Sequence, residues 1–189
     1  MQNVVREWFE ESREAAERSA ALSEVVAEAA GLMVTALKSG RRILVCGNGG
    51  SAADSQHFAA ELIGRFEIER ASLPCIALTT DTSILTAMSN DYGYDTVFAR
   101  QVSALGAPGD VLVGISTSGN SASVERALIE GRSKGMSLVA LLGGSGGRIG
   151  RLDQVCRIIV PSSRTSVIQQ VHITIVHAWA RVIDEAYRA

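Results

Sequence analysis

Five short apolar runs, each followed by a polar or glycine-containing turn, constrain the fold of this chain more than any other feature of its sequence. The runs are nearly continuous rather than alternating with polar residues, as in parallel strands that are covered on both faces. They occupy residues 41–46, 73–78, 110–115, 137–142 and 155–160. Helical stretches separate most of them, and this alternation predicts an α/β fold: three layers, doubly wound around a five-stranded parallel sheet.

The segments between and around the strands carry helical spacing. We expect helices over residues 52–66, 81–105 with a break near 89–93, 121–134 and 164–187. A long N-terminal segment, residues 2–38, has no proline and only Gly31, so it predicts one long or two shorter amphipathic helices. Because no strand precedes it, this segment must lie on the sheet or on another subunit.

The length and composition suit one soluble globular domain. The chain has 189 residues, of which 47% are hydrophobic and 20% charged, and its net charge is −2. We expect a single domain over residues 1–189, with a helical oligomerisation segment at 1–40 and an α/β core at 41–189. The net charge argues against a nucleic-acid partner, since sequence-independent binding needs a basic surface.

Targeting and redox signals are weak. The longest apolar runs are shorter than the ~18 residues of a membrane span, and the N-terminus lacks the basic start and apolar block of a signal peptide. The three scattered cysteines, Cys46, Cys75 and Cys156, lie in apolar strand-like runs. The cysteines predict buried free thiols in a reducing cytoplasm, and the short apolar runs predict no membrane association.

Loops rich in glycine and hydroxyl residues follow three of the strands. They are Gly47–Ser51, Ser116–Ser121 and Gly143–Gly147, and the first two run into helices. Ligands of open α/β sheets bind at the carboxyl ends of the strands, where backbone N–H groups and helix N-termini favour anions. One such loop is equally well explained as a tight turn, but two together predict a phosphate monoester site. Neither loop has the pattern of a nucleoside-triphosphate or dinucleotide site.

Two helices carry groups suited to acid/base or metal chemistry. His57 and Glu61 are four residues apart and share one helix face, where they suit a metal or a substrate oxygen, although such pairs are also common on exposed helices. Gln169 and His177 in the last helix are separated by a rise of about 12 Å, which is long for one metal ion. His172 points about 140° away from His177, which indicates a structural or interface residue.

Several motifs in order resemble the sugar isomerase (SIS) domain of bacterial phosphoheptose isomerases, over nearly the whole chain. They are Cys46–Leu62, Ala77–Ser83, Asn90–Tyr94, Gly114–Ser121 and Ile168–His172 followed by His177. The resemblance implies a flavodoxin-like SIS fold and an aldose-ketose isomerase. The implied reaction converts sedoheptulose 7-phosphate to D-glycero-D-manno-heptose 7-phosphate through an enediol. This is the first step toward nucleotide-activated heptose for surface polysaccharide, including lipopolysaccharide.

The resemblance also implies the working parts of the site. Members are cytoplasmic homotetramers, usually with one zinc ion per subunit. The implied metal ligands are His57, Glu61, Gln169 and His177, and Glu61 and His177 are also the implied acid/base pair. The implied substrate-binding residues are Asn48, Gly49, Gly50, Ser51, Asn90, Asp91, Ser116, Thr117, Ser118, Ser121 and Gln169.

Two residues depart from the family pattern and leave the exact substrate open. Val167 stands where members usually have a basic residue, and Gln170 stands in place of a glutamate. Three alternatives therefore remain: a non-catalytic SIS tetramer that binds the replication initiator, a sugar-phosphate-sensing regulator, and an isomerase of another sugar phosphate. Non-catalytic relatives lack the glutamate and the late histidine, which this chain has, and a regulator would need an additional DNA-binding domain.

The apolar surface of the terminal helices predicts contacts between subunits. The last helix has an apolar stripe at Val171, Ile175, Val176, Trp179, Val182 and Ile183. Together with the N-terminal helix, this stripe exceeds what one face of a five-stranded sheet covers. We therefore expect an oligomer, with a site that can draw residues from two chains.

Overall fold

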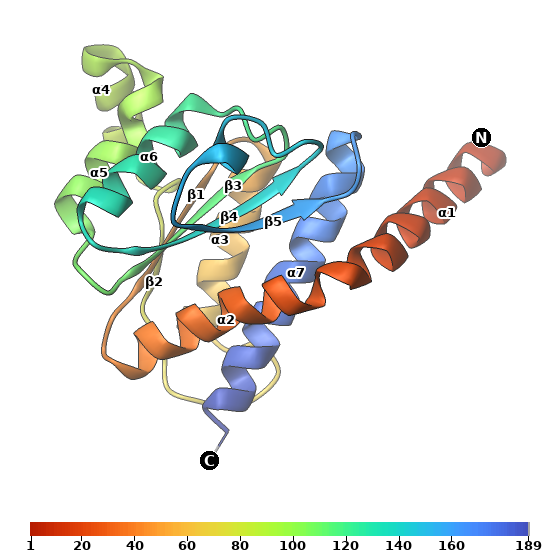
Figure 1. The fold of residues 1–189 in the computed structure, drawn as a ribbon, viewed down its shortest axis with the longest axis horizontal. Helices are drawn as coiled ribbons and strands as arrows, with labels where there is room; N and C mark the ends of the chain where they lie inside the picture. Colours follow the sequence, from red (N-terminus) through yellow and green to blue (C-terminus); the bar gives the residue numbers. More distant parts are fainter. Residues whose placement is uncertain (189) are drawn as a thin grey trace.

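The computed structural model describes residues 1–188 and contains one five-stranded parallel sheet. The strands are β1 (Ile43–Gly47), β2 (Cys75–Ala77), β3 (Val111–Ser116), β4 (Ser137–Gly143) and β5 (Val155–Val160). Their order is β2-β1-β3-β4-β5, and every neighbouring pair is parallel (Figure 1). The predicted doubly wound α/β fold is confirmed.

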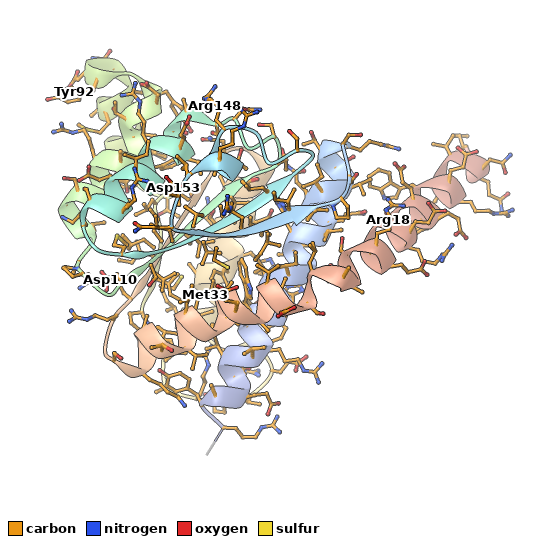
Figure 2. All side chains as sticks on the ribbon, viewed as in Figure 1. Arg18, Met33, Tyr92, Asp110, Arg148 and Asp153 are labelled. Atoms are coloured by element: carbon orange, nitrogen blue, oxygen red, sulfur yellow. The ribbon has the colours of Figure 1, made fainter. Side chains whose placement is uncertain are left out.

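Helices cover both faces of the sheet and give the predicted three layers. They are α1 (Gln2–Ser19), α2 (Ser23–Lys38), α3 (Gly50–Ile63), α4 (Thr82–Tyr92), α5 (Val97–Leu105), α6 (Ala122–Ser133) and α7 (Thr165–Ala186). Helices α2, α3 and α7 share one apolar core with the sheet, and α5 and α6 share the other. Helix α4 has no buried residue, and Tyr92 lies exposed at its outer end (Figure 2).

Element boundaries differ from the sequence-based expectation mainly at β2. Only Cys75–Ala77 form the strand, because Pro74 has no N–H to donate and Leu73 donates its N–H to the carbonyl of Leu62 instead. Strand β2 lies at the edge of the sheet and leaves Ile76 37% exposed. The expectation that this strand is covered on both faces is therefore wrong. The break expected within residues 89–93 is real and falls at Gly93, which ends α4 with a φ of +85°.

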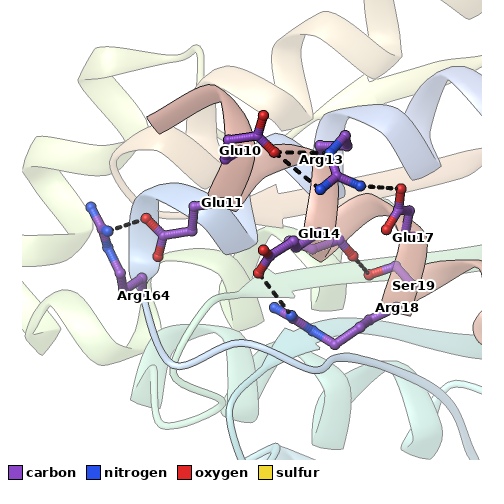
Figure 3. Close-up of polar contacts among 9 residues, drawn as sticks. Glu10, Glu11, Arg13, Glu14, Glu17, Arg18, Ser19 and Arg164 are labelled. Carbon is purple, nitrogen blue, oxygen red and sulfur yellow. Dashed lines mark hydrogen bonds and ion pairs between the residues drawn. The ribbon is translucent and has the colours of Figure 1, made fainter. Parts of the chain in front are cut away.

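The N-terminal segment forms two helices, one of the two predicted forms. A 3₁₀ turn, Ala20–Leu22, separates α1 from α2. Helix α2 packs on the sheet through buried residues such as Met33, whereas α1 buries only Ala15 and extends away from the α/β body (Figure 1). Side-chain ion pairs run along α1, and Arg164 joins Glu11 to the start of α7 (Figure 3).

One stretch of the chain is long and apolar enough to cross a membrane by length and composition. It is the continuous helical segment Gln2–Lys38, with a window of mean hydropathy 1.5 that is 28% buried. The window passes on mean hydropathy although charged residues such as Glu24 and Glu28 interrupt it, so the expectation that no uninterrupted apolar run reaches this length holds. The apolar residues of α2 nevertheless belong to the core beneath the sheet, as in the core helix of a globular domain.

All three cysteines are free thiols. Cys46 and Cys75 are buried as predicted, whereas Cys156 is only half-buried, because it lies on the edge strand β5. Burial raises the pKa of Cys46 and of Cys75 to about 12, which keeps both thiols protonated and unreactive at neutral pH.

Candidate functional site

The predicted phosphate loops meet where the winding of the sheet reverses. Strands β1 and β3 are neighbours, but the helices that follow them, α3 and α6, lie on opposite faces. A crevice at the carboxyl ends of the strands is expected at such a point. Asn48 bridges the two loops, donating from Nδ2 to Ser121 Oγ at 2.6 Å and to Ser123 Oγ at 3.0 Å.

The loops present hydrogen-bond donors without positively charged side chains. Neither α3 nor α6 has a side-chain cap at its N-terminus, and the positive end of a helix favours an anion. In α3, however, the N–H groups of Ser51 and Ala52 donate to the carbonyls of Asn48 and Gly49. Ser51 and Ser116 are buried in the loop bases, Thr117 and Ser121 are half-buried, and Ser118 is exposed.

The third glycine loop supports the serine loop from behind. A Cβ atom on Gly119 would lie 1.9 Å from the carbonyl oxygen of Gly146, so the two backbones pack directly against each other. Ile149 also donates its N–H to the Gly119 carbonyl at 2.9 Å, and Arg148 donates its N–H to Asn120 Oδ1. Residues 143–147 therefore hold the shape of the loop 116–121.

Asn90 and Asp91 are exposed near the end of α4 and hydrogen bond to each other at 2.8 Å. Among the residues described, the link from this segment to the predicted phosphate loops is Tyr94. Its hydroxyl donates to Asn48 Oδ1 at 2.7 Å. Tyr94 lies outside the predicted site, although it belongs to the same motif as Asn90 and Asp91.

Three of the four predicted metal ligands come together between α3 and α7. His57 Nε2 lies 2.9 Å from Glu61 Oε1 and 3.2 Å from His177 Nε2. One donor atom of each residue lies within 4.8 Å of the other two. His57 is exposed, whereas Glu61 and His177 are half-buried, so the cluster is open to a ligand.

Gln169 lies at the other end of the helix pair. A Cβ on Gly50 would come within 2.4 Å of its Nε2 atom, which places the amide beside the phosphate loop. Because α3 and α7 run in the same direction, the Gly50–Gln169 contact is separated from the His57–His177 contact by about two turns of each helix. The structure thus places Gln169 among the predicted substrate-binding residues, and its role as a fourth metal ligand stays a prediction.

The other singled-out residues of α7 face the interior or α1. His172 is fully buried, and its Nε2 lies 3.0 Å from the Leu142 carbonyl, consistent with the predicted structural role. Val167 is fully buried, and Gln170 accepts a hydrogen bond from Ser12 of α1 at 2.6 Å. Both departures from the family pattern are thus used in packing within this chain.

Two side chains outside the predicted set accompany the cluster. Phe66 stacks on His177, with ring centroids 5.4 Å apart and planes at 25°. Asp54 lies one turn before His57, and its Oδ2 is buried without a hydrogen-bond partner among the described residues. Burial raises the pKa of Asp54 to about 6, while the neighbouring His57 acts in the opposite direction. No local spacing rule marks either residue, since both depend on how α3 and the following loop pack.

Comparisons with known proteins identify the family of this chain. The family model described as "SIS domain" matches residues 7–143. The phosphoheptose isomerase of Rhodospirillum rubrum is 48% identical over 186 residues, covering 98% of both chains.

Two solved structures are similar over almost their full length. The phosphoheptose isomerase GmhA from Neisseria gonorrhoeae has a TM-score of 0.92 and 48% identity, with coverage of 97% of this chain and 98% of that one. The Francisella tularensis phosphoheptose isomerase has a TM-score of 0.94 and 41% identity, with the same coverage. This chain therefore belongs to the SIS-domain family, among the phosphoheptose isomerases.

Proposed function

We propose that this protein is an aldose-ketose isomerase that converts sedoheptulose 7-phosphate to D-glycero-D-manno-heptose 7-phosphate. The observation that carries the proposal is that α3 begins at the glycine- and serine-rich loop and carries His57 and Glu61 further along, where they meet His177. His57 follows Ser51 by six residues on α3, a rise of about 9 Å. An extended sugar with its phosphate in the loops would therefore direct its C1–C2 end toward Glu61 and His177.

The reaction moves a proton between neighbouring carbons, and the cluster supplies groups for this transfer. Glu61, as a carboxylate, takes a proton from C1 of the ketose. It then returns the proton to C2, which was the carbonyl carbon. His177 moves a proton between the two oxygens of the enediol. Serine hydroxyls and helix N–H groups hold the phosphate, while Gln169 and Asn48 orient the chain near the loops.

The donor set of the cluster also suits zinc. His177 Nε2 and Glu61 Oε1 both converge on His57 Nε2, and one proton cannot satisfy the lone pairs of all three atoms, whereas a cation can. His57, Glu61 and His177 would hold the ion, with Gln169 as the predicted fourth ligand. Bound zinc would polarise the carbonyl and stabilise negative charge on the enediol oxygens.

The finer biological assignments are part of the same proposal. We infer a homotetramer with one zinc per subunit, located in the cytoplasm and supplying heptose for surface polysaccharide such as lipopolysaccharide. The high identity to phosphoheptose isomerases supports the pathway, and the free thiols suit a reducing compartment. The non-catalytic initiator-binding alternative is disfavoured because Glu61 and His177 are both present and belong to one cluster.

A direct assay tests the activity. Zinc-loaded protein is incubated with sedoheptulose 7-phosphate, and the aldoheptose 7-phosphate is followed by NMR, with Glu61→Gln and His177→Gln alongside. We expect turnover by the wild type and a loss of about 10²–10⁴-fold in kcat in each variant, the range for a positioned acid or base. No turnover by the wild type, with inorganic phosphate binding intact, would instead support a binding protein.

A further inference from the structure

The loop that follows α3 carries an aromatic residue directly onto the predicted catalytic histidine. Phe66 is half-buried, and its ring lies nearly parallel to the imidazole of His177, at 25° and 5.4 Å between centroids. His57 lies against the same imidazole at 5.0 Å, tilted by 60°. The ring of His177 is thus in contact with one aromatic side chain and one metal-ligating side chain.

A buried ion pair, which we call the clip, holds this loop in place. The clip consists of Arg70 and Asp184, whose side chains are 2% and 3% exposed and meet at 2.7 Å. Asp184 also accepts the backbone N–H groups of Glu67 and Ile68, at 2.8 and 3.2 Å. Burial acts to raise the pKa of Asp184, but these hydrogen bonds outweigh it and lower that pKa below its ordinary value.

Arg70 extends the clip to the end of α3. Its Nη2 donates to the carbonyl oxygen of Glu61, and its Nη1 donates to that of Leu62, both at 2.8 Å. Burying a charged pair is costly unless its hydrogen bonds are satisfied, and here nearly every polar atom has a partner. The clip therefore joins the last turn of α3, the loop and α7 at a point seven residues beyond His177.

The clip limits how far Phe66 can move from the imidazole of His177. The backbone on its C-terminal side is fixed at Glu67 and Ile68, and the backbone on its N-terminal side emerges from the clipped end of α3. An imidazole that rotates about its χ2 angle would move Nε2 away from His57 and Glu61. A ring stacked on its face opposes that rotation.

We propose that Phe66 is a positioning residue that holds the His177 imidazole with Nε2 directed into the cluster of His57 and Glu61. The kinetic part of this inference rests on the proposed isomerase function. Groups that hydrogen bond to a metal ligand act through the ligand that they orient, and their loss costs about 10- to 100-fold in metal affinity or activity. We expect the stacked ring of Phe66 to act in the same way, at the lower end of that range.

The test compares Phe66→Leu, which keeps apolar bulk, with Phe66→Tyr, which keeps the ring. In Phe66→Leu we expect the His177 ring-proton NMR signals to move downfield as the ring current is lost, assigned by comparison with His177→Gln. We also expect zinc affinity, measured by chelator competition, to weaken about tenfold, and kcat to fall more than KM changes. In Phe66→Tyr the His177 signals, the zinc affinity and kcat should stay close to those of the wild type. Ile68→Ala, in the same loop, should also leave all three unchanged.

Either of two results would overturn the proposal. One is a Phe66→Leu protein with unchanged His177 signals and zinc affinity, whatever its activity. The other is an effect of equal size in Phe66→Tyr or Ile68→Ala, because the loop rather than the ring would then be responsible. A wild type without isomerase activity would contradict the proposed function, while the NMR and zinc measurements would still decide the role of Phe66.

Discussion

At the scale of single residues, the three histidines divide by the faces of the helices that carry them. His57 and His177 face each other across α3 and α7, whereas His172 faces the sheet and is fully buried. A carbonyl only accepts hydrogen bonds, so the Nε2 atom of His172 carries its proton and donates to Leu142. Burial lowers the pKa of His172 to about 4, although the bond to Leu142 acts in the opposite direction.

This shift predicts acid sensitivity. Below pH 6.5 the unfolded chain protonates His172, while the folded chain does not do so until about pH 4. The contribution of His172 to stability is therefore complete above pH 6.5 and is lost as the pH falls toward 4, by about 3 kcal/mol in total. Urea unfolding of metal-free protein across this range should show a shallower pH dependence in His172→Gln than in the wild type.

In that experiment the slope of stability against pH matters, and the absolute stability does not. The amide of His172→Gln is able to donate to Leu142, but it does not titrate. Equal slopes in the two proteins would show that His172 is not responsible for the loss of stability in acid.

At the scale of elements, the predicted phosphate site is built from loops whose glycine residues have different surroundings. Gly119 and Gly144 both have left-handed φ angles, +64° and +59°. A Cβ on Gly119 would collide with the backbone of Gly146, whereas a Cβ on Gly144 would meet nothing within 4 Å. A substitution at Gly144 therefore measures backbone strain alone, whereas one at Gly119 adds a steric collision to that strain.

Alanine substitutions measure this difference. Gly144→Ala should cost about 1–2 kcal/mol of unfolding free energy, from the left-handed backbone alone. Gly119→Ala should cost more and should also weaken inorganic phosphate binding, measured by calorimetry, because the loop 116–121 must move away from residues 146–147. Equal losses of stability and of phosphate binding in both variants would contradict a supporting role for the third loop.

At the scale of the whole molecule, α1 leaves a group of large apolar side chains exposed within one chain. It buries one residue, and Val4, Val5 and Phe9 are 68%, 55% and 68% exposed. The polar contacts Arg164–Glu11 and Ser12–Gln170 join it to α7, and Ala15 and Trp8 supply its apolar contacts with the core. Exposed apolar residues grouped on one helix are typical of a subunit contact, which agrees with the proposed tetramer.

A charge placed on this surface tests that contact. Phe9→Glu should shift the protein from tetramer toward smaller species in light scattering, because a carboxylate would be buried without a partner. Ile129→Glu, at an exposed apolar position on α6, is the matched control and should leave the mass unchanged. A wild-type protein that is monomeric and fully active would contradict the proposed tetramer.

The alternation of apolar runs and helical spacing determined the α/β class, the five strands and most helix boundaries, because each depends on residues close in sequence. The same locality explains why the His57–Glu61 pair is predictable: a spacing of four residues places both on one helix face. The resemblance supplied His177 by matching position, whereas local spacing offered no reason for it to meet His57. The short β2 depends on Pro74 and on its place at the sheet edge.

Only the tertiary structure decided how distant residues combine. The parallel packing of α3 on α7 brings His57 to His177, puts Gln169 beside Gly50 instead, and sets Phe66 against the imidazole. The clip between Arg70 and Asp184 joins residues 114 positions apart. Distances of this kind are set by the packing of helices against each other and on the sheet, which no periodicity within a single segment specifies.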